Sequence, residues 1–451
     1  MNIWRKLQDK LTYVRIIAVG YLMVIIIGTL LLLLPFATAK GKSTDFLTAL
    51  FTATTSTCVT GLVVVDTGTH WSLFGQLIIL CMIQVGGLGF MTMGMLLAMM
   101  LKRKITLKTR GLLQESMNGM QVGGIVRVVR LALSGTAVVE LGGALLLSIR
   151  FIPLFGVGRG IYYSIFHSVS AFCNAGIDLM GRHYGEYASF VSFEGDILIN
   201  VVLMALIIIG GIGFFVWADI KEKKLQIKKY ALYTKIALFM TAVLLLGGAI
   251  LFFLFENNNL LQGMSLKEKI LGAAFSSVTA RTAGFNTIDT AGLTSASKLF
   301  NMVLMFIGGS PGSTAGGIKT VTMLVLLAYV WSNLRGSKGV NIFKRRLEDD
   351  DIRKASNVMV ISLLLAVVAA ILICFMQPQI DAPDVLFEIF SAIGTVGMST
   401  GITRQLSIGS RIVIILLMYC GRIGSMSFAL SFTERKKVAP VQLPAEKIMI
   451  G

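Results

Sequence analysis

The chain has 451 residues, of which 55% are hydrophobic and only 14% are charged. Apolar runs of about 20 residues, the length that crosses a bilayer, recur along it, so the composition excludes an ordinary soluble domain. The net charge of +18 does not indicate nucleic-acid binding, because the basic residues cluster at the ends of apolar runs. The five cysteines form no C-x-x-C pair, which argues against a structural zinc site or a disulfide framework.

The N-terminus imitates a signal peptide, since Arg5, Lys6 and Lys10 precede an apolar run and Ala37-Thr38-Ala39 follows it. The run from Ile16 to Leu34 is longer than the apolar core of a signal peptide. We therefore expect a transmembrane helix there.

One order of segments then occurs four times: a long apolar helix, a half-length helix, a stretch with a glycine, and a second apolar helix. The first apolar helices are expected at 16–36, 127–152, 233–255 and 356–376. Pro35, Pro153 and Pro378 close three of them, because proline cannot continue a helix. The half-helices, too short to span a bilayer, are expected at 44–57, 160–172, 266–279 and 384–394. The second apolar helices are expected at 71–101, 193–218, 297–332 and 409–432.

This order predicts an all-α integral membrane protein with four fused helix–pore loop–helix repeats around a central pore. Eight transmembrane helices and four re-entrant half-helices follow. The predicted parts are a cytosolic N-terminal stub (1–15), pore repeats (16–101, 127–218, 233–332 and 356–432) and a cytosolic C-terminal tail (433–451). A period of about a hundred residues indicates four fused pseudo-subunits rather than a solenoid.

Each unit carries a polar, small-residue stretch that ends in a glycine. In three units a phenylalanine (Phe51, Phe166, Phe387) lies ten residues before that glycine, whereas in the third unit Ala274 has that place and Phe275 is next to it. Four such loops at membrane depth can close a ring of carbonyls that coordinates a cation, and the negative ends of the half-helix dipoles favour a cation there. The predicted filter residues are Val59, Thr60, Gly61, Asn174, Ala175, Gly176, Thr282, Ala283, Gly284, Thr395, Val396 and Gly397.

Basic residues concentrate in the joints between units and at both termini. The positive-inside rule therefore places the joints and both termini in the cytoplasm, so the half-helices enter the membrane from outside. The residues that carry this prediction are Lys102, Arg103, Lys104, Lys108, Arg110, Lys221, Lys223, Lys224, Lys228, Lys229, Arg335, Lys338, Lys344, Arg345, Arg346, Arg353, Arg435, Lys436 and Lys437.

The third unit differs from the others on the cytosolic side, because its second helix is interrupted by a run of small residues. No straight helix tolerates that density of glycine and proline, and a flexible break below a filter is a natural gate. The predicted gate consists of Gly308, Gly309, Ser310, Pro311, Gly312, Ser313, Thr314, Ala315, Gly316 and Gly317, with the cations Lys319 and Arg422. Lys319 and Arg422 either hold this loop through its carbonyls or have snorkelling or structural roles.

At the four stretches that end in Gly61, Gly176, Gly284 and Gly397, the chain resembles the Trk/Ktr/HKT superfamily of cation transporters, and most closely the bacterial Ktr membrane subunit. The match runs from about residue 15 to 432, in order and spacing. The resemblance implies K+ uptake across the cytoplasmic membrane, with K+ at the filter carbonyls and often with stimulation by Na+. The four retained glycines imply a K+-selective or Na+/K+-permissive filter, while Cys58 stands where Ktr members commonly have threonine.

The same resemblance implies a homodimer, surrounded by membrane lipid, on a cytosolic ring of nucleotide-binding (RCK/KTN) subunits. ATP favours activity in such systems and ADP opposes it. This chain contains no nucleotide motif, so any nucleotide site belongs to the partner. The segment 308–317 resembles the family's intramembrane gating loop.

Other polar residues have two readings each. Arg281 is expected behind the filter as a brace, because a guanidinium on the axis would repel K+. Glu140 is expected to be a buried structural acid rather than an ion ligand, and His167 a packed, hydrogen-bonded residue. Asp66 and Asp178 either enrich cations at the mouth or cap local structure.

Two other classes of function compete with a cation pore. An alternating-access carrier of another cation or small solute also uses broken helices, but it predicts inverted repeats in two halves, whereas the four repeats here run in parallel sense. A membrane enzyme would need a nucleophile, paired carboxylates or a metal-binding cluster, and the three histidines (His70, His167, His183) have no metal-binding spacing. We therefore expect no enzymatic activity.

Overall fold

The computed structural model describes residues 12–89, 92–93, 111, 113–115, 124–224, 226–337 and 339–425. The basic joint at 102–110, most of the N-terminal stub, Lys338 and the tail at 433–451 lie outside these residues. In these residues the regular structure is helical apart from one short antiparallel hairpin, in which β1 (Asn341–Ile342) pairs with β2 (Arg345–Arg346).

Four long apolar helices begin the four units. They are α2 (Tyr13–Leu32), α8 (Ile125–Phe155), α13 (Leu232–Glu256) and α17 (Asp349–Met376). Within the described residues, these four are long and apolar enough to cross a membrane, and the bent pair α11–α12 makes a fifth candidate. Pro153 does not close α8 as predicted, because the helix continues to Phe155 and ends at Gly156, whose φ is 80°.

A half-helix follows each long helix. The four are α3 (Phe46–Cys58), α9 (Val157–Phe172), α14 (Leu266–Thr279) and α18 (Ala382–Gly394). Asp45 caps α3 by accepting the Thr48 N–H, and Ser265 and Glu268 form a reciprocal capping box on α14. Each half-helix packs against the long helix of its own unit.

Within the described residues, the second helices are interrupted rather than continuous, and positions 94–101 and 426–432 of the predicted spans lie outside these residues. They are α5 (Leu73–Leu88), α11 (Ile197–Ile212) with α12 (Phe214–Lys223), α15 (Ser295–Phe306) with α16 (Thr320–Leu334), and α19 (Ile408–Ile423). The predicted continuous helix over 193–218 is wrong, because the chain turns by 90° between α11 and α12 at Gly213, whose φ is 105°. Helices α5 and α19 likewise end at glycines with positive φ, Gly89 and Gly424. The interruption is therefore not confined to the third unit.

Glycines in the second helices allow a close approach to the half-helices. A side chain at Gly86, Gly210 or Gly421 would collide with the backbone carbonyl of Thr57, Phe172 or Ile393, respectively, near the C-terminal end of the half-helix of the same unit. These glycines are close-packing sites, as expected of small residues between membrane helices.

The four units close into a ring. The second helix of each unit packs against the half-helix of the next: α5 on α9, α11 on α14, α15 on α18, and α19 back on α3. Fully buried phenylalanines at equivalent places in the half-helices, Phe51, Phe166, Phe275 and Phe387, lie in the core of this ring. The C-terminal ends of all four half-helices thus converge.

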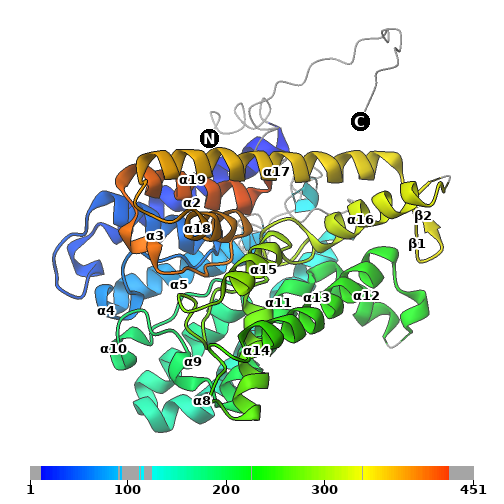
Figure 1. Cartoon of the computed structure of the whole chain (residues 1–451). Helices are drawn as coiled ribbons and strands as arrows, with labels where there is room; N and C mark the ends of the chain where they lie inside the picture. The colour runs from blue at the N-terminus through cyan, green and yellow to red at the C-terminus, as the bar shows by residue number, and fades with distance from the viewer. Residues whose placement is uncertain are drawn as a thin grey trace, which may run out of the picture.

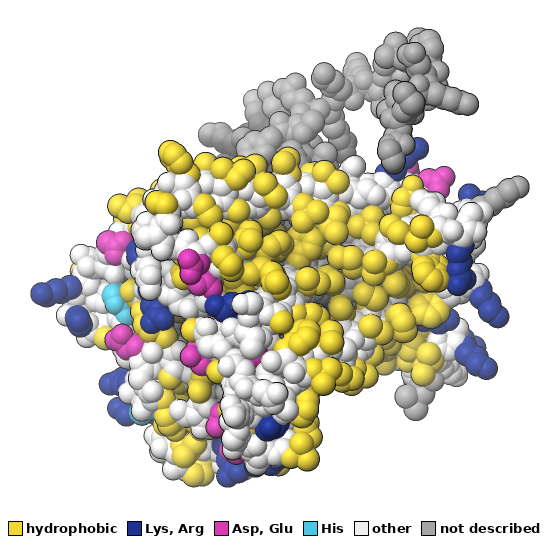
Figure 2. Space-filling model, in the orientation of Figure 1, with side chains coloured by type: hydrophobic (Ala, Val, Ile, Leu, Met, Phe, Trp, Pro, Cys, Tyr) yellow, Lys and Arg dark blue, Asp and Glu magenta, His cyan; other side chains and the backbone are white. Residues whose placement is uncertain are grey.

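The remaining elements are short. They are η1 (Pro35–Ala37), α4 (Thr67–His70), α10 (Gly181–Tyr184), η2 (Val191–Phe193), η3 (Ile227–Lys229) and η4 (Ile402–Gln405). In Figure 1, α4 and α10 lie at one end of the molecule and β1, β2 and α12 at the other, with α17 running between these ends. In Figure 2, apolar side chains form a broad belt between the two ends, and charged side chains gather at the ends. This is the surface of a multi-pass membrane protein.

Candidate ion-conduction site

The loops that follow the half-helices share a strained backbone. Just past each helix end, φ is positive at a residue other than glycine: 55° at Val59, 59° at Asn174, 119° at Thr282 and 49° at Thr395. Three of the four are β-branched, for which this conformation costs about 1–3 kcal/mol. The positive φ at four equivalent positions shows that the four loops share one backbone shape.

Two residues further on, each loop has a glycine with positive φ, and these glycines form a closed ring. A Cβ on Gly61 would strike the carbonyl oxygen of Ala175, and one on Gly176 would strike that of Ala283. In the same way Gly284 lies against the Val396 carbonyl and Gly397 against the Thr60 carbonyl. Each glycine therefore touches the carbonyl that precedes the next glycine, in the order of units one, two, three, four and one again. All four predicted filter stretches are brought together by this contact.

Hydroxyl side chains on the half-helices, which were not predicted from the sequence, bond to the backbone of these loops. Thr55 and Ser391 accept the N–H groups of Gly61 and Gly397, at 3.0 and 3.1 Å. Ser170 and Thr279 donate to the carbonyls of Ile177 and Phe285, both at 2.7 Å. The sequence contains a signal for them, since each hydroxyl residue lies four residues after the phenylalanine of its half-helix.

In the third unit, the stretch from the phenylalanine to the ring glycine is one residue shorter than in the other units. The phenylalanine precedes the ring glycine by ten residues in units one, two and four, but Phe275 precedes Gly284 by nine. Its half-helix ends earlier, at Thr279, and the Ala283 N–H bonds to the Thr279 carbonyl at 2.9 Å. The corresponding N–H groups of Thr60, Ala175 and Val396 bond to the carbonyls of Thr55, Ser170 and Ser391 at 2.8–2.9 Å. The missing residue lies between Thr279 and Ala283, because this bond spans four residues and the other three span five.

Arg281, in this third loop, is buried and donates to the Gly308 carbonyl at 3.4 Å. It thus connects the third loop to the glycine-rich segment below.

A cavity at the α4–α10 end of the molecule opens onto the ring, and all four ring glycines line it. Asp66, Asp178 and Asp289 line the same cavity, as does Arg404, whose guanidinium lies 4.2 Å from the centre of the Tyr187 ring. Three acids and one base give this mouth a net negative lining, which attracts cations.

The two acids singled out from the sequence also have structural roles. Asp66 accepts the N–H groups of Thr69 and Tyr187, at 2.8 and 3.0 Å, and Asp178 accepts that of Met180 at 2.9 Å. Burial, with Asp66 nearby, raises the pKa of Asp178 to about 7.

The glycine-rich segment runs directly under the ring. The Thr314 side chain donates to the Phe172 carbonyl at 3.0 Å and accepts from the Asn174 amide at 2.9 Å. The backbone of the segment bonds to the broken second helix of unit two, from Ser310 N–H to the Gly211 carbonyl and from Phe214 N–H to the Gly312 carbonyl. A Cβ on Gly316 would strike the Thr395 side chain. Together with the bond from Arg281 to Gly308, these contacts join the segment to the second, third and fourth ring loops.

Two cations bind the carbonyls of this segment. Lys319 donates to Ala315 and Gly316, at 2.7 and 3.3 Å. Arg422 donates to the Thr314 carbonyl and, through its other terminal nitrogen, to the carbonyls of Gly86 and Gly87. Its guanidinium thus joins α19, α5 and the segment.

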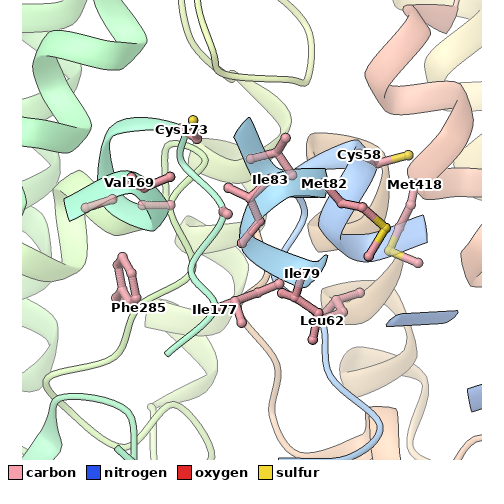
Figure 3. Packing of buried hydrophobic residues seen from close by; sticks show 14 of the residues in the cluster. Cys58, Leu62, Ile79, Met82, Ile83, Val169, Cys173, Ile177, Phe285 and Met418 are labelled. Atoms are coloured by element: carbon pink, nitrogen blue, oxygen red, sulfur yellow. The ribbon is translucent and has the colours of Figure 1, made fainter. Parts of the chain in front are cut away.

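Other predicted residues lie behind the loops. Glu140 accepts from the Gln84 amide at 3.1 Å, and its backbone carbonyl accepts the Ser168 hydroxyl at 2.6 Å. His167 bonds to the Tyr163 carbonyl and accepts the Leu179 N–H at 3.1 Å, so it is a packed, hydrogen-bonded residue. Cys58 belongs to the same buried cluster as Met82 and Met418, and Figure 3 shows the three close to one another.

The fold and the site together define a helical, multi-pass membrane protein in which four re-entrant loops surround a common axis. The model of the TrkH family, described as cation transport protein, matches residues 9–439. The chain belongs to this family of ion transporters, which are not enzymes.

Two of its relatives match over nearly their whole length. It is 39% identical to "Potassium/sodium uptake protein NtpJ" of Enterococcus hirae, with 99% of each chain covered. It is also 39% identical to "Ktr system potassium uptake protein B" of Bacillus subtilis, with 98% of this chain and 97% of that protein covered. The fold resembles the crystal structure of the potassium transporter TrkH from Vibrio parahaemolyticus, with a TM-score of 0.69, 18% identity, and coverage of 92% and 84%.

Proposed function

We propose that this chain is the membrane subunit of a K+ uptake system and that K+ crosses the ring of carbonyls formed by Thr60, Ala175, Ala283 and Val396. The proposal rests on one observation. Each ring glycine lies against the backbone carbonyl of the residue just before the ring glycine of the next loop, so the four contacts form a closed ring. Rings of backbone carbonyls replace the hydration shell of a cation. The two relatives are named as a potassium/sodium uptake protein and a potassium uptake protein, which supports a monovalent cation as the transported ion.

Electrostatics favours a cation at this ring from both the helices and the mouth. Helices α3, α9, α14 and α18 direct their C-terminal, negative ends at the ring, and each end carries about half an elementary charge. The acids of the outer cavity concentrate cations before the ring. The positive charges of Lys319 and Arg422 lie beyond the ring, where their hydrogen bonds hold the segment 308–317.

The segment 308–317 acts as the gate in this proposal. It crosses the path below the ring and is held by Lys319, Arg422 and the Asn174–Thr314 bond. Opening requires these bonds to break or shift, and a change of a few kcal/mol is sufficient to convert a minor open state into the main one.

Regulation and assembly are proposed on the resemblance to Ktr systems. The chain forms a homodimer in the cell membrane and binds a cytosolic ring of RCK/KTN subunits, whose ATP and ADP sites control the gate; Na+ stimulates transport. Both termini and the joints between units are cytoplasmic. The basic surface of β1–β2, where Arg345 and Arg346 are exposed, is consistent with this orientation.

Growth of a K+-uptake-deficient bacterium on limiting K+ tests the proposal. Cells that carry the chain together with a cytosolic RCK subunit are expected to grow, and cells with an empty vector are not. An alternating-access carrier of another solute, the competing proposal, predicts no rescue although the protein is present in the membrane. Uptake of rubidium tracer in the same cells separates a failure of transport from a failure of expression.

A further inference from the structure

A cavity of about 570 Å³, separate from the mouth described above, lies between the first two units. Trp71 and the start of α5 form one wall, Arg159 and Tyr162 of α9 another, and Arg182 of α10 closes it. In Figure 1, α9 and α10 lie toward the same end of the molecule as α4. A volume of this size is typical of a small-molecule site.

The cavity carries positive charge without a counter-charge from the described residues. Arg159 and Arg182 are exposed, and neither makes a hydrogen bond or ion pair with the part of the chain that the structure describes. Arg150, one turn before the end of α8, contrasts with them because it pairs with Asp196 at 3.0 Å. Burial and the two nearby arginines, Arg159 and Arg182, lower the pKa of His183, which is next to Arg182 in α10.

Two further features favour an anion here. Helix α9, which is 16 residues long, begins at Val157 with no capping side chain and no acidic residue in its first turn, so the positive end of its dipole is open. Trp71, 1% exposed, lines the cavity, and its indole N–H has no hydrogen-bond partner among the described residues. Tyr162, in the wall, is held in place because its hydroxyl donates to the Gln76 amide oxygen at 3.0 Å.

The surroundings of the cavity are apolar. Leu73, Val157 and Ile161 are 60%, 65% and 44% exposed and lie on the helices that form its walls. Tyrosine and tryptophan beside a lipid-facing surface are typical of the headgroup level of a bilayer. An occupant with a phosphate at one end and hydrocarbon at the other fits both parts.

We propose that this cavity binds the phosphodiester headgroup of an anionic phospholipid, with Arg159 and Arg182 on the phosphate and the acyl chains along Leu73, Val157 and Ile161. Guanidinium groups match phosphate oxygens in geometry as well as in charge. The assignment of this lipid to the outer leaflet rests on the orientation proposed above. The binding itself does not depend on that orientation. Free inorganic phosphate shares the headgroup chemistry but would leave the apolar rim unused.

Native mass spectrometry of the purified full-length chain, titrated with phosphatidylglycerol or phosphatidylcholine, tests the proposal. The wild type is expected to bind phosphatidylglycerol at least about fivefold more tightly than the double variant Arg159→Gln/Arg182→Gln. The matched control Lys228→Gln/Lys267→Gln removes two exposed charges that do not line the cavity and should keep wild-type binding. Thermal melting in phosphatidylcholine verifies that each variant is folded.

Inorganic phosphate serves as the competing probe. In the proposal, millimolar phosphate does not displace phosphatidylglycerol. Displacement by phosphate would instead assign the cavity to a free anion, and equal binding of phosphatidylglycerol by both double variants would overturn the site altogether. Rubidium flux is not part of this measurement, so its result is independent of whether the chain conducts K+.

Discussion

The side-chain amide of Asn174, in the second ring loop, donates to the hydroxyl of Thr314, in the segment below the ring, at 2.9 Å. Both residues are buried. The bond connects the proposed filter directly to the proposed gate. A displacement of the segment 308–317 should therefore shift or break a contact of the second ring loop.

Replacing Thr314 with valine tests this connection. Valine keeps the shape of threonine but removes the bonds to Asn174 and to the Phe172 carbonyl, which should destabilise the fold by about 1–3 kcal/mol. We expect rubidium flux into liposomes without the partner ring to rise, because the segment is no longer tied to the loop. Ser313→Ala, in the same segment, is the control, since Ser313 bonds only to groups of its own segment among the described residues. If the Thr314→Val protein folds and its flux without the partner ring is unchanged, the Asn174–Thr314 bond does not couple the filter to the gate.

Gly61→Ser should weaken K+ uptake strongly and raise the K+ concentration required for growth, with less effect on Na+ permeation. A Cβ at Gly61 meets the Ala175 carbonyl, and φ is 94° there, so the ring must distort. Gly142→Ser is the matched control, because Gly142 lies in α8 and a Cβ there meets nothing within 4 Å. Normal uptake kinetics in a normally expressed Gly61→Ser variant would remove Gly61 from the filter.

The gate prediction concerns Arg422 and the length of the segment it holds. Arg422→Ala, or deletion of residues 311–313, should raise flux in liposomes that lack the partner ring, because the closed arrangement loses its anchors. Arg411→Ala, on the outer part of the same helix, should not, since Arg411 contacts the Arg404 carbonyl instead. If both gate variants fold and dimerise but conduct no more than the wild type, closure lies elsewhere.

Because Asp178 lines the mouth, we expect the apparent K+ affinity to depend on external pH. Burial raises the pKa of Asp178 to about 7, so its carboxyl is charged above that pH and neutral below it. Apparent K+ affinity should therefore fall by roughly two- to fivefold as external pH decreases from about 8 to 6, because a neutral acid no longer attracts cations. Asp178→Asn should show the low affinity at both pH values. Parallel pH curves for variant and wild type would assign the effect to another group.

Orientation is tested by single cysteines in a background where the exposed Cys81 is replaced by serine. Cysteines at Ser43 and Ser265 should react with an impermeant thiol reagent on intact cells, and cysteines at Lys224 and Arg345 should react only after the cells are opened. Labelling of the Lys224 position from outside would reverse the proposed topology.

The sequence carried the order of the elements better than their continuity. Long apolar runs and the repeated glycine stretches were sufficient to predict four long helices and four half-helices, because both depend on local composition. The turn at Gly213 was not predictable, since a glycine in an apolar run suits either a bend or a close helix contact, and only the packing of α11 and α12 against the segment 308–317 selects the bend.

Tertiary relationships were beyond the sequence for the same reason. The cyclic contacts of Gly61, Gly176, Gly284 and Gly397 depend on how four distant segments meet. The cavity at Arg159 and Arg182 likewise forms only when α9 and α10 pack beside the first unit. The hydroxyl anchors, in contrast, were readable from their fixed spacing to the four phenylalanines.

The central claim is that K+ crosses the ring of four carbonyls, and competition for rubidium uptake into liposomes containing the purified chain and its partner ring tests it most directly. We predict that K+ suppresses uptake at lower concentrations than Na+ does, and that Gly61→Ser abolishes this preference while Gly142→Ser retains it. Rubidium uptake with the same ion preference in all three proteins would contradict the account, because the ring would then not be the site that selects the ion.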